Sequence, residues 1–282
     1  MRKVVMTGVT SGLGVEWLYE LDRTLEAEFF LLARSENKFH ELISNRPLAN
    51  EFHLIRCDFA SFEDIDLAAK MIEETTDSVD ILINNAGVWA PETMHRTVDG
   101  VELTFAVNHL APYILTGKLI LLLNKQRGAR IINTASFRHK DAEIDKEDIQ
   151  AEKEYDAEQS YCNSKLFSVL FTRSLSRLLD NGKVTANCFD PGIVDTPMFF
   201  QGFPKSVKFL YPVVRKIISR TPLKGAETGV FLSTSSSVES KSGRYYKNCK
   251  ETKSSRLSND PDMAKWLWTE SEKLTGFCYP KL

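Results

Sequence analysis

The sequence predicts an α/β fold in which a doubly wound parallel sheet, a Rossmann fold, forms a single domain. Short runs of β-branched and aromatic residues alternate with segments of helical spacing along all 282 residues. A glycine-rich turn follows the first run, and no proline- or glycine-rich linker, internal repeat or low-complexity tract divides the chain. Because such alternation places the strands in one parallel sheet with helices on both faces, one domain is the expected architecture.

Six segments are predicted as strands. They are residues 3–6, 28–32, 51–56, 81–84, 129–134 and 183–189. The second includes Phe29-Phe30-Leu31-Leu32, which is apolar throughout, as expected for a strand that is covered on both faces. Each strand leads through a turn into a segment with apolar residues at helical spacing, for example residues 166–179 after the Tyr161 region.

Composition and charge indicate a soluble protein. The chain is 43% hydrophobic and 26% charged, with a net charge of −2, so it offers nucleic acid no strong positive field. The apolar stretch 113–123 contains Gly117 and Lys118 and is too short to span a bilayer. The first apolar run begins within three residues of Met1, so neither a signal peptide nor an N-terminal membrane anchor is expected.

Cysteine and histidine usage predicts a cytoplasmic protein without a metal site. The five cysteines are scattered, odd in number and free of any C-x-x-C pair, which is typical of reduced thiols rather than of disulfides or zinc ligands. None of the five histidines belongs to a convincing ligand cluster. We interpret His95, His109 and His139 as surface or loop residues.

The glycine-rich turn is a candidate phosphate site. The first strand runs into Thr7-Gly8-Val9-Thr10-Ser11-Gly12-Leu13-Gly14, and a helical pattern follows. Glycines allow the backbone to turn sharply and approach a pyrophosphate, whose charge is met by amides at the helix N-terminus. Glycines in an ordinary surface turn are the alternative. The position between the first strand and a helix favours dinucleotide binding.

The end of the second strand favours NADP over NAD. An Asp or Glu about 20 residues after the glycines would bond the adenosine ribose hydroxyls, but the chain has Arg34 there. A guanidinium is permanently charged and can bind the 2′-phosphate of NADP through two donors. A solvated surface arginine is the alternative. Asp58, after the third strand, is a candidate acceptor for the adenine amino group or else a turn-forming residue.

The segment Tyr161-Cys162-Asn163-Ser164-Lys165 resembles the Tyr-x-x-x-Lys motif of the short-chain dehydrogenase/reductase family. The likeness covers nearly the whole chain, and further motifs occur in the family's order. These are the glycine turn, Asn84-Asn85-Ala86-Gly87, Asn108, Ser136 and Pro191-Gly192. The resemblance implies that Asn108, Ser136, Tyr161 and Lys165 are catalytic, and that Asn85, Ala86 and Gly87 belong to the cofactor site.

Within that family the sequence is most similar to the retinol dehydrogenase-like branch. The similarity lies in Phe105-Ala106-Val107-Asn108-His109-Leu110, in the long segment between Ser136 and Tyr161, and in Ser242-Gly243-Arg244-Tyr245-Tyr246. The sequence departs from the pattern of this branch in two ways. Many members of the branch have an N-terminal membrane segment that is not found here. Asp190 stands where Asn or His is more usual before Pro-Gly, which should perturb only local bonding.

The expected chemistry is acid/base catalysis by Tyr161. A free tyrosine has a pKa of about 10, too high for a base at neutral pH, but Lys165 lies four residues on, on the same helix face. A cation there should lower the tyrosine pKa, and the resemblance implies that it also bonds the nicotinamide ribose. Ser136 would stabilise the developing alkoxide, and Asn108, by resemblance, would hold a water in a proton relay.

Residues after the sixth strand are predicted to hold the nicotinamide side of the cofactor. Pro191, Gly192, Ile193 and Thr196 resemble the family's carboxamide-binding loop. A helix cap at Asp195 or Thr196 with Pro197 at the first helical position is a second role that could coexist with it.

Residues 198–220 are expected to cover an apolar substrate. They combine aromatic and aliphatic residues with interspersed lysines and arginines, and in the family this region forms a mobile lid. A buried helix pair whose basic side chains reach for solvent is equally compatible, and a third alternative is a segment that touches a membrane surface. By analogy with the family, a dimer or tetramer is plausible.

Two classes of function remain open from the sequence. The first is an NADP(H)-dependent oxidoreductase that acts on a bulky apolar carbonyl or alcohol, such as a retinal-like or steroid-like compound. The second is a nucleotide-sensing or scaffold protein with the same fold and little turnover. The presence of both Tyr161 and Lys165 favours the first.

Overall fold

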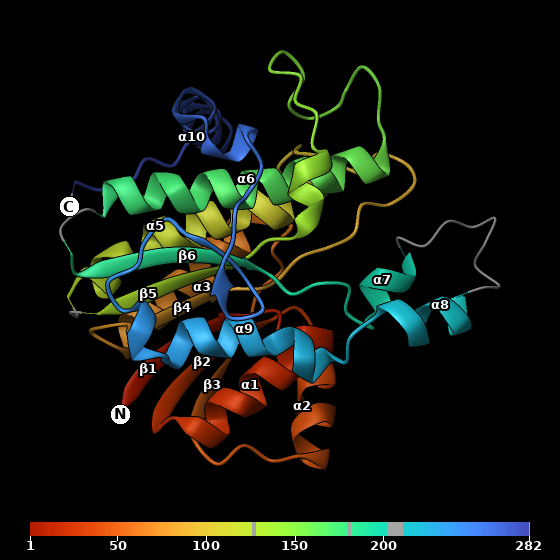
Figure 1. Cartoon of the computed structure of the whole chain (residues 1–282). Coiled ribbons are helices and arrows are strands. Elements are labelled where there is room, and N and C mark those ends of the chain that lie inside the picture. Colours follow the sequence, from red (N-terminus) through yellow and green to blue (C-terminus); the bar gives the residue numbers. More distant parts are fainter. Residues whose placement is uncertain (126–127, 180–181, 202–210, 282) are drawn as a thin grey trace.

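A computed structural model describes residues 1–125, 128–179, 182–201 and 211–281. Its centre is an eight-stranded sheet in the order β3-β2-β1-β4-β5-β6-β7-β8, with helices on both faces (Figure 1). Strands β1 to β7 run parallel and β8 pairs antiparallel with β7. The strand order reverses between β1 and β4, as it does in a doubly wound sheet. The predicted fold class is confirmed.

The strands agree closely with the sequence-based prediction. Their bounds are β1 (Arg2–Thr7), β2 (Ala27–Ala33), β3 (Glu51–Arg56), β4 (Ile81–Asn84), β5 (Ala129–Thr134), β6 (Val184–Asp190), β7 (Tyr245–Lys247) and β8 (Lys250–Glu251). All residues of β2 and β6 are buried, as strands covered on both faces should be. Of the strands in the described residues, the two short ones, β7 and β8, were not predicted.

The described helices include one group on each face of the sheet and others that lie outside these two groups (Figure 1). Their bounds are α1 (Gly12–Thr24), α2 (Glu36–Asn45), α3 (Phe62–Thr75), α4 (Leu103–Phe105), α5 (Ala111–Asn124), α6 (Ala157–Leu178), α7 (Pro197–Gln201), α8 (Tyr211–Ile218), α9 (Pro222–Thr234) and α10 (Pro261–Thr275). Helices α1 and α9 pack together on one face of the sheet, and α3, α5 and α6 cover the other (Figure 1). Helix α10 lies on α6, further from the sheet, and α7 and α8 lie outside both groups.

Among the described residues, one helical stretch is long and apolar enough to cross a membrane by length and composition. Helix α4, a π-helical turn (Ala106–Leu110) and α5 are continuous, so Leu103–Asn124 spans 22 residues with a mean hydropathy of 1.4. The helical run is therefore longer than the stretch recognised in the sequence. Of an apolar 18-residue window in this stretch, 83% is buried inside the protein. Its apolar side chains therefore belong to the protein core, where they pack with side chains of α3 and α6.

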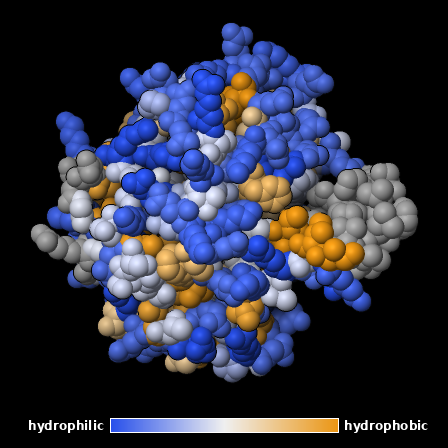
Figure 2. Space-filling view, viewed as in Figure 1, coloured by the Kyte–Doolittle hydropathy of each residue, from blue (hydrophilic) through white to orange (hydrophobic). Residues whose placement is uncertain are grey.

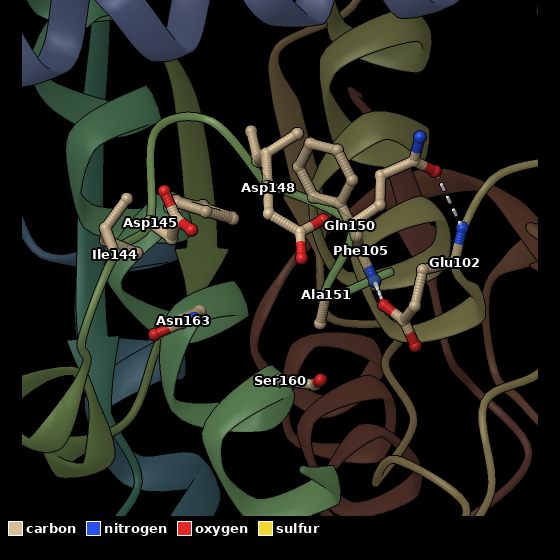
Figure 3. Close-up of a pocket in the computed structure, with 11 residues that line it drawn as sticks. Glu102, Phe105, Ile144, Asp145, Asp148, Gln150, Ala151, Ser160 and Asn163 are labelled. Carbon is tan, nitrogen blue, oxygen red and sulfur yellow. Dashed lines mark hydrogen bonds between the residues drawn. The ribbon is translucent and has the colours of Figure 1, made fainter. Parts of the chain in front are cut away.

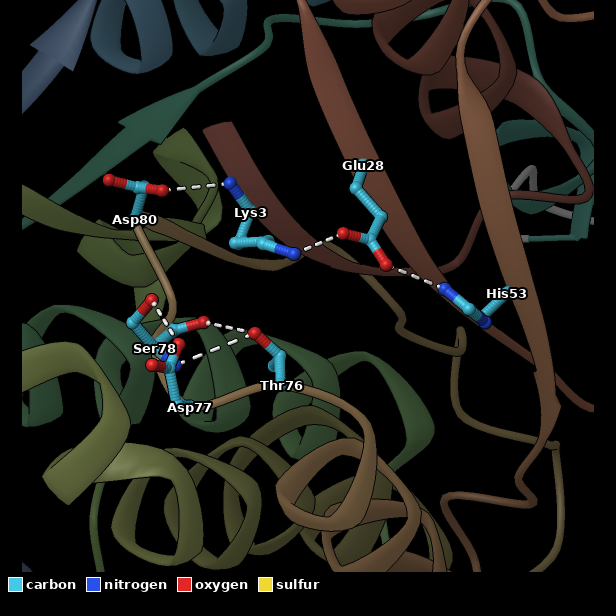
Figure 4. Close-up of polar contacts among 7 residues, drawn as sticks. All are labelled: Lys3, Glu28, His53, Thr76, Asp77, Ser78 and Asp80. Carbon is cyan, nitrogen blue, oxygen red and sulfur yellow. Dashed lines mark hydrogen bonds and ion pairs between the residues drawn. The ribbon is translucent and has the colours of Figure 1, made fainter. Parts of the chain in front are cut away.

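Polar side chains tie the first three strands together at the edge where the strands begin (Figure 4). Glu28 of β2 pairs with the Lys3 amine of β1 and, at 2.7 Å, with His53 Nε2 of β3. The Lys3 amide donates to Asp80, just before β4, at 2.8 Å. These contacts lie at the opposite end of the strands from the glycine turn, so we interpret them as structural.

Two histidines differ from their predicted places. His109 and His139, expected at the surface or in loops, are each 1% exposed. His109 lies in the π-helical turn, where its Nε2 hydrogen-bonds the Ser271 hydroxyl of α10 at 2.8 Å. His139 lies in the 3₁₀ turn Phe137–Asp141. A buried polar ring is tolerated where it is hydrogen-bonded: His139 is bonded through both ring nitrogens, and His109 through Nε2 only, its Nδ1 having no partner among the described residues.

Candidate active site

The turn between β1 and α1 needs glycine at three positions. Gly8 and Gly12 have φ angles of +73° and +53°, in the left-handed region that favours glycine. A Cβ on Gly14 would lie 1.9 Å from the Gly8 carbonyl oxygen, so the helix begins directly against the turn. Thr10 and Ser11 lie between the glycines with accessible side chains, and Leu13 is buried. The helix begins at Gly12, so its first amides point out of the turn.

The segment after β4 packs against this turn. The Thr7 hydroxyl oxygen accepts hydrogen bonds from the amides of Asn85 and Ala86, both at 2.9 Å. The Asn85 side-chain amide donates to the Gly8 carbonyl at 3.2 Å. The segment that contains Asn85, Ala86 and Gly87 therefore stabilises the glycine turn through these hydrogen bonds.

Gly87 connects this region to the candidate catalytic residues. A Cβ on Gly87 would lie 3.2 Å from Asn108 Oδ1 and 3.7 Å from Lys165 Nζ. Asn108 is held in the π-helical turn, and π-turns within α-helices occur often at functional sites. Its Oδ1 accepts from the Val88 amide at 2.8 Å, and its Nδ2 donates to the Ser164 hydroxyl at 3.0 Å. Asn108 is thus fixed between the loop after β4 and α6.

Tyr161 and Lys165 lie one turn apart on the buried face of α6. They are 8% and 5% exposed, and Lys165 Nζ lies 5.5 Å from the centre of the Tyr161 ring. The amine donates to the Thr134 carbonyl, at the end of β5, at 3.1 Å. The geometry therefore brings the acid/base pair to the carboxyl end of the sheet.

Burial controls the protonation of this pair. It lowers the pKa of Lys165 to about 8. It also raises the pKa of Tyr161, which a hydrogen bond with Ser136 lowers only in part. The prediction that the lysine brings the tyrosine pKa down is wrong for this structure, because removal of the phenol from water outweighs every other influence on it.

Ser136 completes the group. It follows β5 and caps the 3₁₀ turn Phe137–Asp141, where its Oγ accepts from the Arg138 amide at 3.3 Å. Its hydroxyl is also close enough to Tyr161 for a hydrogen bond. The structure thus brings Asn108, Ser136, and the pair Tyr161 and Lys165 together from three different segments of the chain.

Two apolar side chains cover the exposed side of Tyr161. The indole of Trp89 lies over the phenol ring, with ring centres 4.3 Å apart and planes tilted by 31°. The Tyr161 hydroxyl donates to the sulfur of Met198, at the start of α7, across 4.0 Å. Met198 was expected as part of the lid, whereas the position of Trp89 over Tyr161 follows only from the fold.

The loop after β6 lies against the glycine turn. A Cβ on Gly12 would lie 2.7 Å from a methyl carbon of Thr196. Pro191 and Gly192 begin the loop, and the Ile193 carbonyl accepts from the Arg220 amide at 2.8 Å. Helix α7 begins at Pro197, as predicted, and the Thr196 carbonyl accepts from the Phe200 amide at 3.3 Å.

Asp190, the departure before Pro-Gly, has a local role. Its side chain is fully buried, pairs with Lys247 of β7 at 2.8 Å, and accepts from the Gly192 amide at 2.9 Å. Lys247 therefore balances the buried charge, and the carboxylate shapes the turn.

Arg34 and Asp58 follow neighbouring strands at the same edge of the sheet. Arg34 is exposed between β2 and α2, just before Ser35, which caps α2. Asp58 Oδ1 accepts from the Ala60 amide at 3.0 Å, which is the turn-forming role considered for it. A contact between Asp58 and adenine is compatible with this bond, because a carboxylate has several acceptor sites.

A pocket lies beside the start of α6 (Figure 3). Its acidic side chains are used by nearby backbone amides. Glu102 accepts from the Thr104 and Phe105 amides at 2.8 and 2.7 Å, and Asp148 accepts from those of Glu152 and Lys153, both at 2.8 Å. The pocket therefore marks where the long segment before Tyr161 docks onto the body of the protein.

Comparison with known proteins assigns the family. The family described as short chain dehydrogenase matches residues 2–205. The chain belongs to this family. Mouse retinol dehydrogenase 14 is 34% identical to it over 98% of this chain and 86% of its own length. For human retinol dehydrogenase 13 the values are 32%, 100% and 86%, and for human polyprenol dehydrogenase they are 30%, 98% and 85%. The chain thus lies in the retinol dehydrogenase-like branch of the short-chain dehydrogenases.

Solved structures share the fold. A crystal structure of an uncharacterized protein from Mycobacterium paratuberculosis has a TM-score of 0.80 and 26% identity over 99% of this chain and 95% of that one. L-Sorbose reductase from Gluconobacter frateurii, solved with NADPH and L-sorbose, has a TM-score of 0.70 and 21% identity over 87% and 94%. Membership of the short-chain dehydrogenase family and similarity to retinol dehydrogenases make this protein an oxidoreductase of alcohol or carbonyl substrates that uses a nicotinamide cofactor.

The residues present fit such a cofactor. The glycine turn leaves no room for a Cβ, yet presents the amides that begin α1, which suits a pyrophosphate. Tyr161, Lys165 and Ser136 lie at the carboxyl end of β5, across the reversal in strand order from β2 and Arg34. In a doubly wound sheet, ligands bind in this crevice.

Proposed function

We propose that the protein is an NADP(H)-dependent oxidoreductase that moves hydride between nicotinamide and a bulky apolar carbonyl or alcohol, with Tyr161 as acid/base. The observation that carries this proposal is the cluster of Tyr161, Lys165, Ser136 and Asn108 beside the glycine turn. Each of these polar side chains is less than 9% exposed. Burial of four polar groups is costly unless they bond one another or a ligand.

Each residue of the cluster has a separate role in the proposal. Tyr161 holds its proton at neutral pH, because burial raises its pKa, and so it can act as the acid that protonates the oxygen of a carbonyl being reduced. The Ser136 hydroxyl donates to the same oxygen as negative charge develops there. Lys165, which is held by the Thr134 carbonyl, and Asn108, which is held by the Val88 amide, line the site with polar groups. When bound, the nicotinamide supplies or accepts the hydride.

Preference for NADP rests on Arg34. The guanidinium is exposed at the carboxyl end of β2, where a cofactor on the glycine turn would place its adenosine ribose. A permanent positive charge with several donors favours the 2′-phosphate of NADP over the bare hydroxyl of NAD. No acidic side chain at this position would repel that phosphate.

An apolar substrate is supported by what covers Tyr161. Trp89 and Met198 offer an aromatic face and a deformable thioether, both suited to a long or flat hydrocarbon. Relatives named for retinol and polyprenol suggest the same class. We propose that residues 198–220 form the lid; positions 202–210, with Phe203, Lys205, Lys208, Phe209 and Leu210, lie outside the described residues.

We further propose a cytoplasmic protein whose lid can touch a membrane surface. Phe200, Ile217 and Ile218 are 44%, 75% and 47% exposed near the basic residues Arg215 and Lys216. Figure 2, which is viewed as Figure 1, shows hydrophobic residues in the region where Figure 1 draws α7 and α8. An apolar surface with basic neighbours suits contact with anionic lipid.

Cofactor titration and turnover test this function. Purified protein is titrated with NADPH and NADH, and NADPH consumption is then followed with a panel of apolar aldehydes and ketones. We expect tighter binding of NADPH and turnover of at least one bulky substrate. Tight binding without turnover of any substrate would favour a nucleotide sensor instead.

A further inference from the structure

His139 is buried directly behind Ser136. It lies in the 3₁₀ turn that Ser136 caps and is 1% exposed. Its ring packs against that of Tyr245 in β7, with centres 4.8 Å apart. His139 is not one of the four candidate catalytic residues, so the burial of its ring needs another explanation.

The two ring nitrogens of His139 have different partners. Nδ1 lies 2.6 Å from the carbonyl oxygen of Ser136, and the Ser255 amide donates to Nε2 across 3.0 Å. A backbone amide can only donate and a carbonyl can only accept. The proton must therefore be on Nδ1, and Nε2 must be bare. Burial also lowers the pKa of His139, which favours this neutral ring.

The imidazole thus joins two segments that are 116 residues apart in sequence. On one side it holds the turn that begins with Ser136. On the other it holds the segment after β8, where Arg173 of α6 also donates to the Ser254 hydroxyl at 3.0 Å. The Ser136 carbonyl accepts from the His139 amide as well, at 3.2 Å, so His139 contacts that peptide group twice.

We propose that His139 is a positioning residue for Ser136, whose carbonyl it holds through a neutral imidazole protonated at Nδ1. The inference rests on the proposed function. Because the Ser136 carbonyl and side chain share one α-carbon, a peptide held at this angle directs the hydroxyl toward Tyr161 and the substrate oxygen. Loss of the bond lets the peptide tilt, and a shift of about 1 Å in a catalytic group can cost about 100-fold in rate.

Two substitutions separate the two bonds of the ring. In His139→Asn the side-chain NH₂ can take the place of Nδ1 and keep the bond to Ser136. In His139→Gln the side-chain oxygen can reach the place of Nε2 and keep only the bond from Ser255. We expect kcat to fall by about 10- to 100-fold in His139→Gln, the range found when a side chain that orients a metal ligand loses its hydrogen bond, and by less than about 3-fold in His139→Asn.

Neither variant should change KM or the affinity for NADPH by more than about 2-fold, because the bond acts on the reacting oxygen. The matched control is His109, equally buried and bonded to Ser271. His109→Asn and His109→Gln should lose thermal stability without the difference in kcat between them. A purely structural role for His139 would make both of its variants lose kcat in proportion to their loss of stability, and that result would overturn the inference.

Nitrogen NMR of the wild-type protein tests the same inference without turnover. We expect His139 to show a protonated Nδ1 and an unprotonated Nε2 at neutral pH. A protonated Nε2, or a doubly protonated ring, would overturn the inference whatever the variants do. Absence of turnover in the wild type would refute the proposed function, whereas turnover with equal losses in both variants would refute only the role of His139.

Discussion

Replacement of Lys165 by methionine should raise the free energy of unfolding relative to wild type, and this gain should be larger at neutral pH than at high pH. The same substitution should abolish turnover. The amine is 5% exposed, and burial lowers its pKa from 10.5 to about 8. Because the unfolded chain keeps the ordinary pKa, folding at pH 7 must strip water from a charged amine. At 1.36 kcal/mol per pKa unit this penalty is about 3 kcal/mol.

The sign of the pH dependence follows from the same pKa values. Below pH 8 the lysine is charged in both states and the full penalty applies. Between pH 8 and 10.5 the folded state loses its proton first, so the unfolded state binds more protons and wild-type stability rises with pH through this group. Lys165→Met lacks the group. Its advantage over wild type should therefore shrink by about 2.5 kcal/mol between pH 7 and pH 10.

Urea unfolding of both proteins at pH 7, 8, 9 and 10 measures this difference. The lost hydrogen bond to Thr134 shifts the variant by an amount that does not depend on pH, so only the change with pH is diagnostic. Lys70→Met, whose side chain is 70% exposed, is the control and should show no such trend. A gap between Lys165→Met and wild type that stays constant from pH 7 to pH 10 would refute the reasoning.

Three further changes test the rest of the site. Gly14→Ala places a Cβ 1.9 Å from the Gly8 carbonyl oxygen, so we expect a loss of about 1–3 kcal/mol in unfolding free energy and weaker NADPH binding by titration; unchanged binding would contradict the role of the turn. Arg34→Ala removes a charge-assisted contact worth about 1.5–3 kcal/mol, so NADPH affinity should fall by about 10- to 100-fold while NADH affinity stays the same. An equal loss for both cofactors would refute the role of Arg34. Trp89→Ala removes the indole over Tyr161, so kcat/KM should fall by about 10-fold for bulky apolar substrates and less for small ones, and a uniform fall would argue against a substrate wall.

Local pattern predicted the strands well because buried parallel strands leave a continuous apolar run. Residues 51–56, 81–84 and 129–134 were placed with the bounds that β3, β4 and β5 have. Strand β7 was not predicted, because it has three residues and depends on β6 for its pairing. Strands this short carry too few positions for an alternating pattern.

The site was predicted in its parts but not in its contacts. Glycine spacing and the Tyr-x-x-x-Lys pattern are local, so they can be read from the chain. The contact between Trp89 and Tyr161 joins residues far apart in sequence, and no local signal announces it. The direction of the Tyr161 pKa shift also needed the structure. The sequence shows that a lysine lies nearby, but it does not show how deeply the Tyr161 phenol is buried. His139 was misplaced for the same reason, since its partners Ser136 and Ser255 meet only in the fold.

The most direct test of the central claim compares wild type with Tyr161→Phe. NADPH binding is measured by fluorescence for both proteins, and NADPH consumption is followed with the bulky aldehyde or ketone that wild type turns over fastest. We predict equal NADPH binding and a loss of turnover of at least about 100-fold in the variant, since acid/base groups contribute about 10²- to 10⁴-fold. Turnover within a few-fold of wild type would show that Tyr161 is not the acid/base and would contradict the account.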